Sequence, residues 1–230
     1  MSSRPDAAAG GAARAPGAGE RTVVHLLRHG EVFNPRKILY GRLPGYHLSE
    51  LGRTMAERAA AYFTGRDVVT LVASPLERAQ ETAAPIGAAL GLPIGTDDRL
   101  IEAGNAFEGR AFGVGDGVLR HPASWPLLRN PFRPSWGEPY VELAARMGAA
   151  VAAARAASVG HEAVLVSHQL PIWVARLAAE KRWFVHDPRR RECSLASVTS
   201  LEFAGTTLVA IGYAEPSRDL LPGAQKVSGA

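Results

Sequence analysis

Three short apolar runs, each followed by polar side chains, are the sequence feature that most limits what this chain can fold into. The runs cover residues 22–27, 68–73 and 163–167. Each has the length and β-branched content of a buried strand. Two further β-rich runs, residues 194–203 and 207–213, predict a hairpin at the sheet edge. Because helical patterns separate the first three runs, we predict an α/β fold with a mostly parallel central sheet covered on both faces.

Apolar residues at helical spacing predict four helices, over residues 51–63, 76–90, 140–157 and 171–177. Ser49 is a good N-cap for the first. Before the second, we expect Ser74 to be the N-cap, Pro75 to occupy the first helical position and Glu77 to complete a capping box. Arg78 would then lie in the first turn, where free backbone N–H groups and the helix dipole favour an anion.

The predicted domain covers residues 21–214, between two segments rich in Ala, Gly, Pro and Ser. We expect residues 1–20 and 215–230 to be disordered tails, because they carry too few large apolar side chains to offset the entropy of ordering. Inside the domain, residues 110–138 are rich in Gly and Pro but also contain tryptophan, leucine and phenylalanine. We interpret this irregular segment as a packed insertion or lid.

Composition and charge narrow the classes of function. The 230 residues carry 26 Lys plus Arg against 22 Asp plus Glu, an excess too small to indicate nucleic-acid binding. Arg42 and the run 189–191 are interpreted as solvated loop charges. No stretch is apolar and long enough to cross a membrane, and the single cysteine, Cys193, forms no internal disulfide. We therefore expect a cytoplasmic protein with neither membrane nor nucleic-acid partners, and the sequence does not show whether the chain has a protein partner.

Polar side chains follow each of the three predicted parallel strands. Arg28 and His29 follow the first strand, Arg78 lies just after the second, and His168 follows the third. In open sheets of this kind, ligands bind beyond the carboxyl ends of the strands. We therefore expect these four residues to meet in one phosphate-handling site.

These residue types are suited to phosphoryl transfer. Two arginines can hold phosphoryl oxygens, a neutral histidine can attack phosphorus, and a second histidine, protonated, can stabilise the charge that builds in the transition state. A carboxylic acid must protonate the leaving oxygen. Glu102, just past a short predicted strand, is the first candidate for this acid, and Glu108 is the alternative. No cluster has metal-ligand spacing, so we expect a metal-independent reaction without a cofactor.

The sequence from Leu27 to Glu31, Leu-Arg-His-Gly-Glu, resembles the signature of the histidine phosphatase superfamily, the phosphoglycerate mutase-like proteins. Other parts of the chain are similar to further motifs of that family, in the same order: Asn34, residues 74–79, residues 100–109, and Ser167 with His168. Val32 and Gln169 depart from the family pattern, and both departures fall at the expected substrate rim. The resemblance implies a three-layer α/β/α sandwich.

The same resemblance assigns roles to individual residues. It implies that His29 is the phosphorylated nucleophile and that Glu102 is the proton donor. Arg28, Arg78 and His168 would complete the phosphate site, and Asn34 would be a further substrate contact.

We therefore expect a histidine acid phosphatase or phosphoglycerate mutase-like phosphatase. It would hydrolyse a small phosphorylated metabolite through a phosphohistidine intermediate. One alternative is a phosphoglycerate mutase-type phosphotransferase, in which the insertion at residues 110–138 excludes water. A second alternative is a non-catalytic, regulatory module that binds a phosphorylated ligand.

Overall fold

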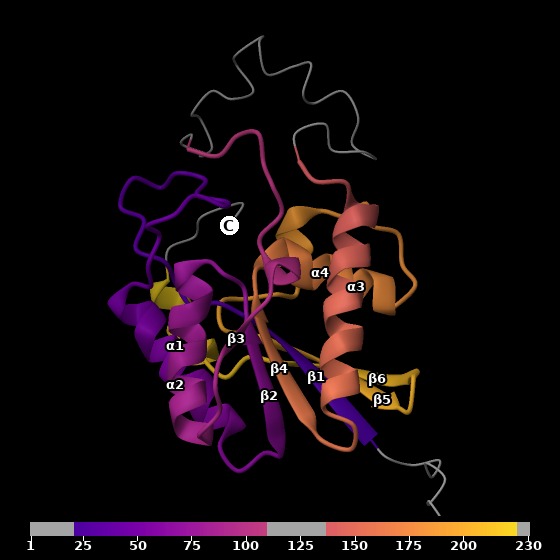
Figure 1. The fold of residues 1–230 in the computed structure, drawn as a ribbon. Coiled ribbons are helices and arrows are strands. Elements are labelled where there is room, and N and C mark those ends of the chain that lie inside the picture. The colour runs from indigo at the N-terminus through magenta and orange to yellow at the C-terminus, as the bar shows by residue number, and fades with distance from the viewer. Residues whose placement is uncertain (1–20, 110–136, 225–230) are drawn as a thin grey trace, which may run out of the picture.

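A six-stranded mixed sheet forms the centre of the protein (Figure 1). The computed structural model describes residues 21–109 and 137–224, so the predicted N-terminal tail and nearly all of the predicted insertion lie outside the described residues. The strands lie in the order β3-β2-β4-β1-β5-β6. Strands β1 to β4 run parallel to one another, β5 pairs antiparallel with β1, and β6 pairs antiparallel with β5. The strand bounds are β1 Arg21–Arg28, β2 Val68–Ala73, β3 Gly95–Thr96, β4 Glu162–Ser167, β5 Val198–Ala204 and β6 Thr207–Ala214.

Two pairs of helices cover the sheet, one pair on each face (Figure 1). Helices α1 and α2 pack on one face, and α3 and α4 pack on the other. Their bounds are α1 Glu50–Phe63, α2 Glu77–Leu90, α3 Tyr140–Ala157 and α4 Gln169–Ala179. This α/β arrangement confirms the predicted three layers, the mostly parallel centre and the hairpin at one edge. None of the helices in the described ranges has the length and apolar character to cross a lipid bilayer.

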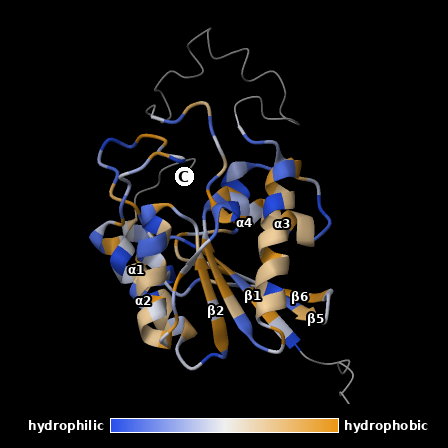
Figure 2. Cartoon of the chain, in the orientation of Figure 1, coloured by the Kyte–Doolittle hydropathy of each residue, from blue (hydrophilic) through white to orange (hydrophobic). Residues whose placement is uncertain are grey.

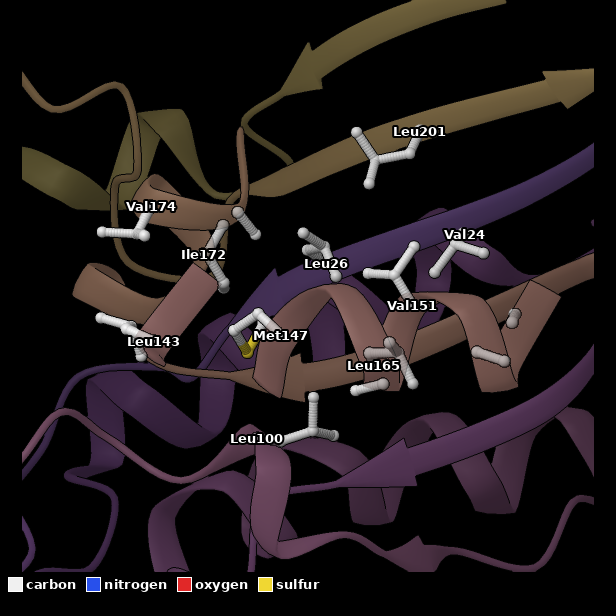
Figure 3. Packing of buried hydrophobic residues seen from close by; sticks show 14 of the residues in the cluster. Val24, Leu26, Leu100, Leu143, Met147, Val151, Leu165, Ile172, Val174 and Leu201 are labelled. Atoms are coloured by element: carbon white, nitrogen blue, oxygen red, sulfur yellow. The ribbon is translucent and has the colours of Figure 1, made fainter. Parts of the chain in front are cut away.

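The central strands are apolar on both sides because each face packs against helices. Leu26 and Leu27 are adjacent in β1 and fully buried, yet they belong to different clusters. Leu26 packs with Met147 of α3, as Figure 3 shows, whereas Leu27 packs on the side of Phe63. The central strands are correspondingly hydrophobic in Figure 2. Successive residues of β1 therefore pack against the two helix layers in turn.

The start of α2 differs from the prediction. Helix α2 begins at Glu77, its N-cap is Leu76, and no side chain caps it. The Ser74 hydroxyl instead lies 2.8 Å from Nε2 of His168, and a Glu77 carboxylate oxygen accepts the backbone N–H of Gly45. The capping box was wrong because both of its polar side chains have tertiary partners. The placement of Arg78 in the first turn is nevertheless correct.

Part of the predicted C-terminal tail is ordered. Residues Arg218–Gly223 form a short 3₁₀ helix after β6. The Ser217 hydroxyl, which is buried, donates to the carbonyl of Met55 in α1 at 3.5 Å. This tertiary contact gives residues 215–224 an anchor that their composition does not show, while residues 225–230 lie outside the described residues.

Candidate active site

Two adjacent parallel strands bring His29 and His168 together. Arg28 at the end of β1 is in register with Ser167 at the end of β4, and the backbone N–H of His29 donates to the Ser167 carbonyl at 3.1 Å. His168 follows directly after β4 as the N-cap of α4, and the two imidazole centroids are 5.1 Å apart. Both side chains are fully buried. The predicted meeting of the strand ends is therefore seen in the structure.

Arg78 enters the same place from the first turn of α2. Its side chain is fully buried, and one terminal nitrogen, Nη2, donates to the carbonyl of Gly41 at 2.6 Å. The guanidinium lies over the ring of Tyr40, 4.8 Å from its centroid, in a cation–π contact. Within the described ranges, Nε and Nη1 of Arg78 have no hydrogen-bond partner. Buried donors of this kind are suited to an anionic oxygen.

His29 is oriented by its own backbone neighbour. Nδ1 lies 2.7 Å from the carbonyl of Gly30, and since a carbonyl only accepts, this nitrogen carries the proton. Nε2 then holds the lone pair and has no hydrogen-bond partner among the described residues. Burial, with the charges of Arg78 and Arg28, lowers the pKa of His29 well below its usual value. The result is a neutral imidazole with a free lone pair, the form required of a nucleophile.

His168 has a similar environment but a different partner. Its Nε2 lies 2.8 Å from the Ser74 hydroxyl, and its Nδ1 is buried without a partner in the described part of the chain. Burial lowers the pKa of His168 well below its usual value, and the charges of Arg78 and Arg28 act in the same direction. The neutral imidazole is therefore favoured over the protonated form that the sequence led us to expect, because burial disfavours the charge. Arg28, in turn, donates from Nη1 to the carbonyl of Cys193 at 2.7 Å. These contacts fix both residues around His29.

The structure places Glu102 and Glu108 in different surroundings. The Glu102 side chain is buried, and its carboxylate accepts the N–H of Ala103 at 2.8 Å. Burial raises the pKa of Glu102, against the smaller opposing effects of that N–H, Arg78 and Arg28. The Glu108 carboxylate instead accepts the backbone N–H groups of Arg42 and Asn105. We call Arg28, His29, Arg78, Glu102 and His168 the strand-end cluster.

An ion-pair network holds the backbone around Glu102. Arg42, predicted as a solvated charge, is only partly exposed and donates from Nε to the Glu102 carbonyl at 2.6 Å. Arg42 and Arg146 both pair with Glu138, and Arg146 also donates to the carbonyl of Arg99. A cavity of about 630 Å³ lies against this network, lined by Arg42, Glu138, Arg146 and their neighbours. The network anchors the main chain on either side of the predicted proton donor.

Asn34 is occupied in holding its own loop. Its side-chain amide donates to the carbonyl of Ile38 at 2.8 Å and accepts the N–H of the same residue at 3.2 Å. The structure therefore shows the turn role of Asn34, and its substrate contact stays a prediction. Within residues 21–109 and 137–224, no group of three or more His, Cys, Asp or Glu is placed to hold a metal ion.

Sequence reasoning missed several residues that shape this cluster. Tyr40 covers Arg78, and Ser74 contacts His168. Thr82 accepts the N–H of Gly30 and donates to the carbonyl of Arg78, so it joins the loop after β1 to α2. Two of them had a sequence signal: Ser74 belongs to the motif at residues 74–79, and Thr82 follows Arg78 by one helical turn. The interpretation of residues 189–191 as an exposed turn was wrong for Arg191, which is partly buried and turned inward.

Comparison with known proteins agrees with this geometry. A model of the histidine phosphatase superfamily (branch 1) matches residues 24–215. This chain belongs to the histidine phosphatase superfamily. The match covers every residue of the strand-end cluster, and it confirms the resemblance found in the sequence.

Three relatives match this chain over different lengths. An uncharacterized protein of Mycobacterium tuberculosis H37Rv, Rv0525, is 57% identical over 198 residues, which cover 86% of this chain and 98% of that protein. The solved structure of mycobacterial glucosyl-3-phosphoglycerate phosphatase is 29% identical, covers 79% of this chain and 90% of its own, and has a TM-score of 0.65. A 2,3-bisphosphoglycerate-dependent phosphoglycerate mutase of Thermoplasma acidophilum is 40% identical over 80 residues, only 34% of this chain and 40% of that protein.

Proposed function

We propose that this protein is a phosphomonoester hydrolase that forms a phosphohistidine on Nε2 of His29. The observation that carries the proposal is the state of that imidazole, which is neutral, oriented by Gly30 and close to two buried arginines. Its lone pair lies among donors on Arg78 and His168 that have no partner in the described part of the chain. A phosphoryl group supplies oxygen acceptors for those donors and an electrophile for the lone pair.

The first half of the reaction transfers the phosphoryl group to His29. Arg28 and Arg78 hold its oxygens and balance their charge. Nε2 of His29 bonds to phosphorus while the bond to the leaving oxygen breaks. Glu102, which burial keeps protonated to higher pH than an ordinary carboxyl, gives its proton to that oxygen. His168 donates to the phosphoryl group in the transition state.

The second half releases phosphate. The Glu102 carboxylate accepts a proton from water as the water oxygen attacks phosphorus, and the bond to His29 breaks. The cycle restores the neutral imidazole and the protonated carboxyl. Because the two arginines supply the positive charge, the proposed mechanism is metal-independent.

A phosphatase is favoured over a mutase by the solved structure of a phosphatase that resembles this chain. The structure of mycobacterial glucosyl-3-phosphoglycerate phosphatase matches 79% of this chain, whereas in sequence a glucosyl-3-phosphoglycerate phosphatase and the mutase each match 34% of it. We propose a small phosphorylated metabolite as the substrate.

A panel of phosphorylated metabolites, including phosphoglycerates, tests this function. Both phosphate release and phosphate migration should be measured for the wild-type protein and the His29→Ala variant. We expect phosphate release, with acid-labile covalent phosphate on the wild type, and loss of both in the variant. His161→Ala is a matched control, because His161 is exposed and pairs with Asp67 away from the cluster. Undiminished release by His29→Ala would contradict the proposal, and His29-dependent migration without release would favour the mutase.

A further inference from the structure

A third arginine, Arg191, turns toward the strand-end cluster from the loop between α4 and β5. Its neighbours Arg189 and Arg190 are exposed, but Arg191 is partly buried. Nε of Arg191 donates to Nε2 of His186 at 2.9 Å, and Nη1 donates to the side-chain oxygen of Gln169 at 3.3 Å. Two side chains therefore fix the guanidinium in one orientation.

Gln169 connects Arg191 to the cluster directly. It follows His168 in sequence, and its amide nitrogen donates at 3.3 Å to the carbonyl of Cys193. The same carbonyl accepts Nη1 of Arg28 at 2.7 Å. The hydrogen bonds thus run from Arg28 through Cys193 and Gln169 to Arg191. Gln169 is one of the residues at which the sequence departs from the family pattern.

His186 is held in the form that can accept a hydrogen bond from Arg191. Its Nδ1 lies 2.6 Å from the carbonyl of Phe184, so this nitrogen carries the proton and Nε2 is an acceptor. The ring packs against Trp173 and Tyr140, with centroids 5.8 Å and 6.0 Å away. Burial lowers the pKa of His186, and the charge of Arg191 lowers it further. The imidazole is therefore a neutral, aromatic-packed support for the guanidinium.

The charge of Arg191 is not balanced by a dedicated ion pair. Nearby carboxylates pair elsewhere: Glu192 with Arg176, and Asp187 with Arg189. Among the described residues, no carboxylate oxygen lies within 4.0 Å of a guanidinium nitrogen of Arg191. The acidic group with the largest charge effect on Arg191 is Glu102, the proposed proton donor. A partly buried guanidinium without a paired carboxylate is stabilised by an anion that binds beside it.

We propose that Arg191 binds a second anionic group, a carboxylate or a further phosphate, on the leaving-group side of the substrate. Glu102 marks that side, because it protonates the leaving oxygen. Arg191 is joined to the same cluster by the hydrogen bonds that run through Gln169 and the Cys193 carbonyl to Arg28. The inference rests on the proposed phosphatase function and narrows its substrate class. Phosphomonoesters that carry a second anionic group are favoured over those that do not. Gln169 and His186 act as positioning residues for Arg191.

Two probes that differ in one group test this preference. 3-Phosphoglycerate has a carboxylate where glycerol 3-phosphate has a hydroxymethyl group. We expect the wild-type protein to have a higher kcat/KM for 3-phosphoglycerate. Arg191→Gln should lower that value by about 10- to 100-fold, the usual effect of losing a hydrogen bond to a charged group, and change the value for glycerol 3-phosphate less than about threefold. Fructose 1,6-bisphosphate and fructose 6-phosphate form a second pair, in which phosphate replaces carboxylate as the second anion.

Matched variants separate binding from a structural role. Arg190→Gln removes an exposed charge from the adjacent position and should leave the preference unchanged. Gln169→Ala should weaken the preference in the same direction as Arg191→Gln, and Arg191→Lys should restore part of it. Circular dichroism and thermal melting confirm that each variant is folded. Equal losses on both members of a pair, or a wild type without a preference, would overturn the inference.

A measurement without turnover keeps this test separate from the proposed function. Isothermal titration of 3-phosphoglycerate and glycerol 3-phosphate into the His29→Ala protein, with and without Arg191→Gln, gives the affinity ratio directly. Hydrolysis of 4-nitrophenyl phosphate, which has no second anionic group, reports the phosphatase function alone. Tighter binding of 3-phosphoglycerate that depends on Arg191 supports the inference even where hydrolysis fails, and equal binding of the two probes contradicts it even where hydrolysis succeeds.

Discussion

Burial sets the charge state of the titratable side chains in the strand-end cluster. His29 and His168 are kept neutral, since their pKa values lie well below the usual range, while the raised pKa of Glu102 favours its protonated form. The positive charge of the cluster therefore comes from Arg28 and Arg78. A nucleophile without a proton and an acid with one are the forms that the first half of the proposed reaction requires.

The pH dependence of the rate should separate Glu102 from Glu108. Activity should fall as pH rises through the raised pKa of Glu102, because the donor then loses its proton. His29 does not cause this fall, because its lowered pKa keeps it neutral even at pH values well below the ordinary pKa of histidine. Glu102→Gln removes the transferable proton and should lower kcat by about 10²- to 10⁴-fold. It should also abolish that alkaline fall in initial-rate measurements.

Glu108→Gln is the matched control for this prediction. Its carboxylate accepts two loop N–H groups, and the amide oxygen of glutamine can accept them too. The alkaline fall should therefore be kept. If the alkaline fall in activity persisted in Glu102→Gln and disappeared in Glu108→Gln, the donor role would belong to Glu108.

At the level of elements, the loop after β1 is pressed against the start of α1. A Cβ added to Gly52 would lie 2.0 Å from the carbonyl oxygen of Glu31, and one added to Gly30 would lie 2.5 Å from the Gly52 carbonyl oxygen. Ser49 caps the helix by accepting the Gly52 N–H, and its hydroxyl contacts Glu31. Because His29 and Glu31 flank Gly30, this close approach helps to place the nucleophile.

Alanine at two helical glycines should have opposite effects. Gly52→Ala introduces a clash with backbone and should lower the free energy of unfolding by about 1–3 kcal/mol, with a loss of activity. Gly148→Ala places its methyl group in open space on α3 and should raise that free energy by up to about 1 kcal/mol. Urea unfolding and phosphatase assays measure both effects. If Gly52→Ala changed neither the free energy of unfolding nor the activity, the loop would have to relax without displacing His29.

The arrangement of helices and strands could largely be predicted from the sequence. Alternating strands and helices predicted the layers, and the strand ends predicted that Arg28, His29, Arg78 and His168 would meet. Local patterns failed where a side chain has a distant partner, as Ser74 has in His168 and Ser217 has in Met55. Arg191 was missed for the same reason, because its supports Gln169 and His186 come from other positions in the fold.

For the molecule as a whole, the buried histidines should make stability depend on pH. His25, His29 and His168 are fully buried, and burial lowers the pKa of each below 6.5. The unfolded chain binds protons at these sites below about pH 6.5, whereas the folded chain does not until the pH reaches the lowered pKa. Their contribution to stability is thus complete above pH 6.5 and is lost as the pH falls. Glu102 acts in the opposite direction, because its raised pKa adds stability as the pH falls.

The lowered pKa of His186 acts in the same direction as those of the three buried histidines, whereas the raised pKa of the exposed His47 acts with that of Glu102. Four histidines with a lowered pKa outweigh these two groups, so the free energy of unfolding should be smaller at pH 5 than at pH 7.5. Each histidine that is protonated in the unfolded chain but neutral in the folded chain lowers the free energy of unfolding by up to about 1.4 kcal/mol for every pH unit below its unfolded pKa. Urea titrations across this range measure the slope, provided the transition is two-state. His168→Asn should flatten the slope, whereas His161→Asn, at an exposed site, should leave it as steep. A stability that rises between pH 7.5 and pH 5 would mean that these histidines take up protons in the folded protein, and the proposed neutral nucleophile would then lose its physical basis.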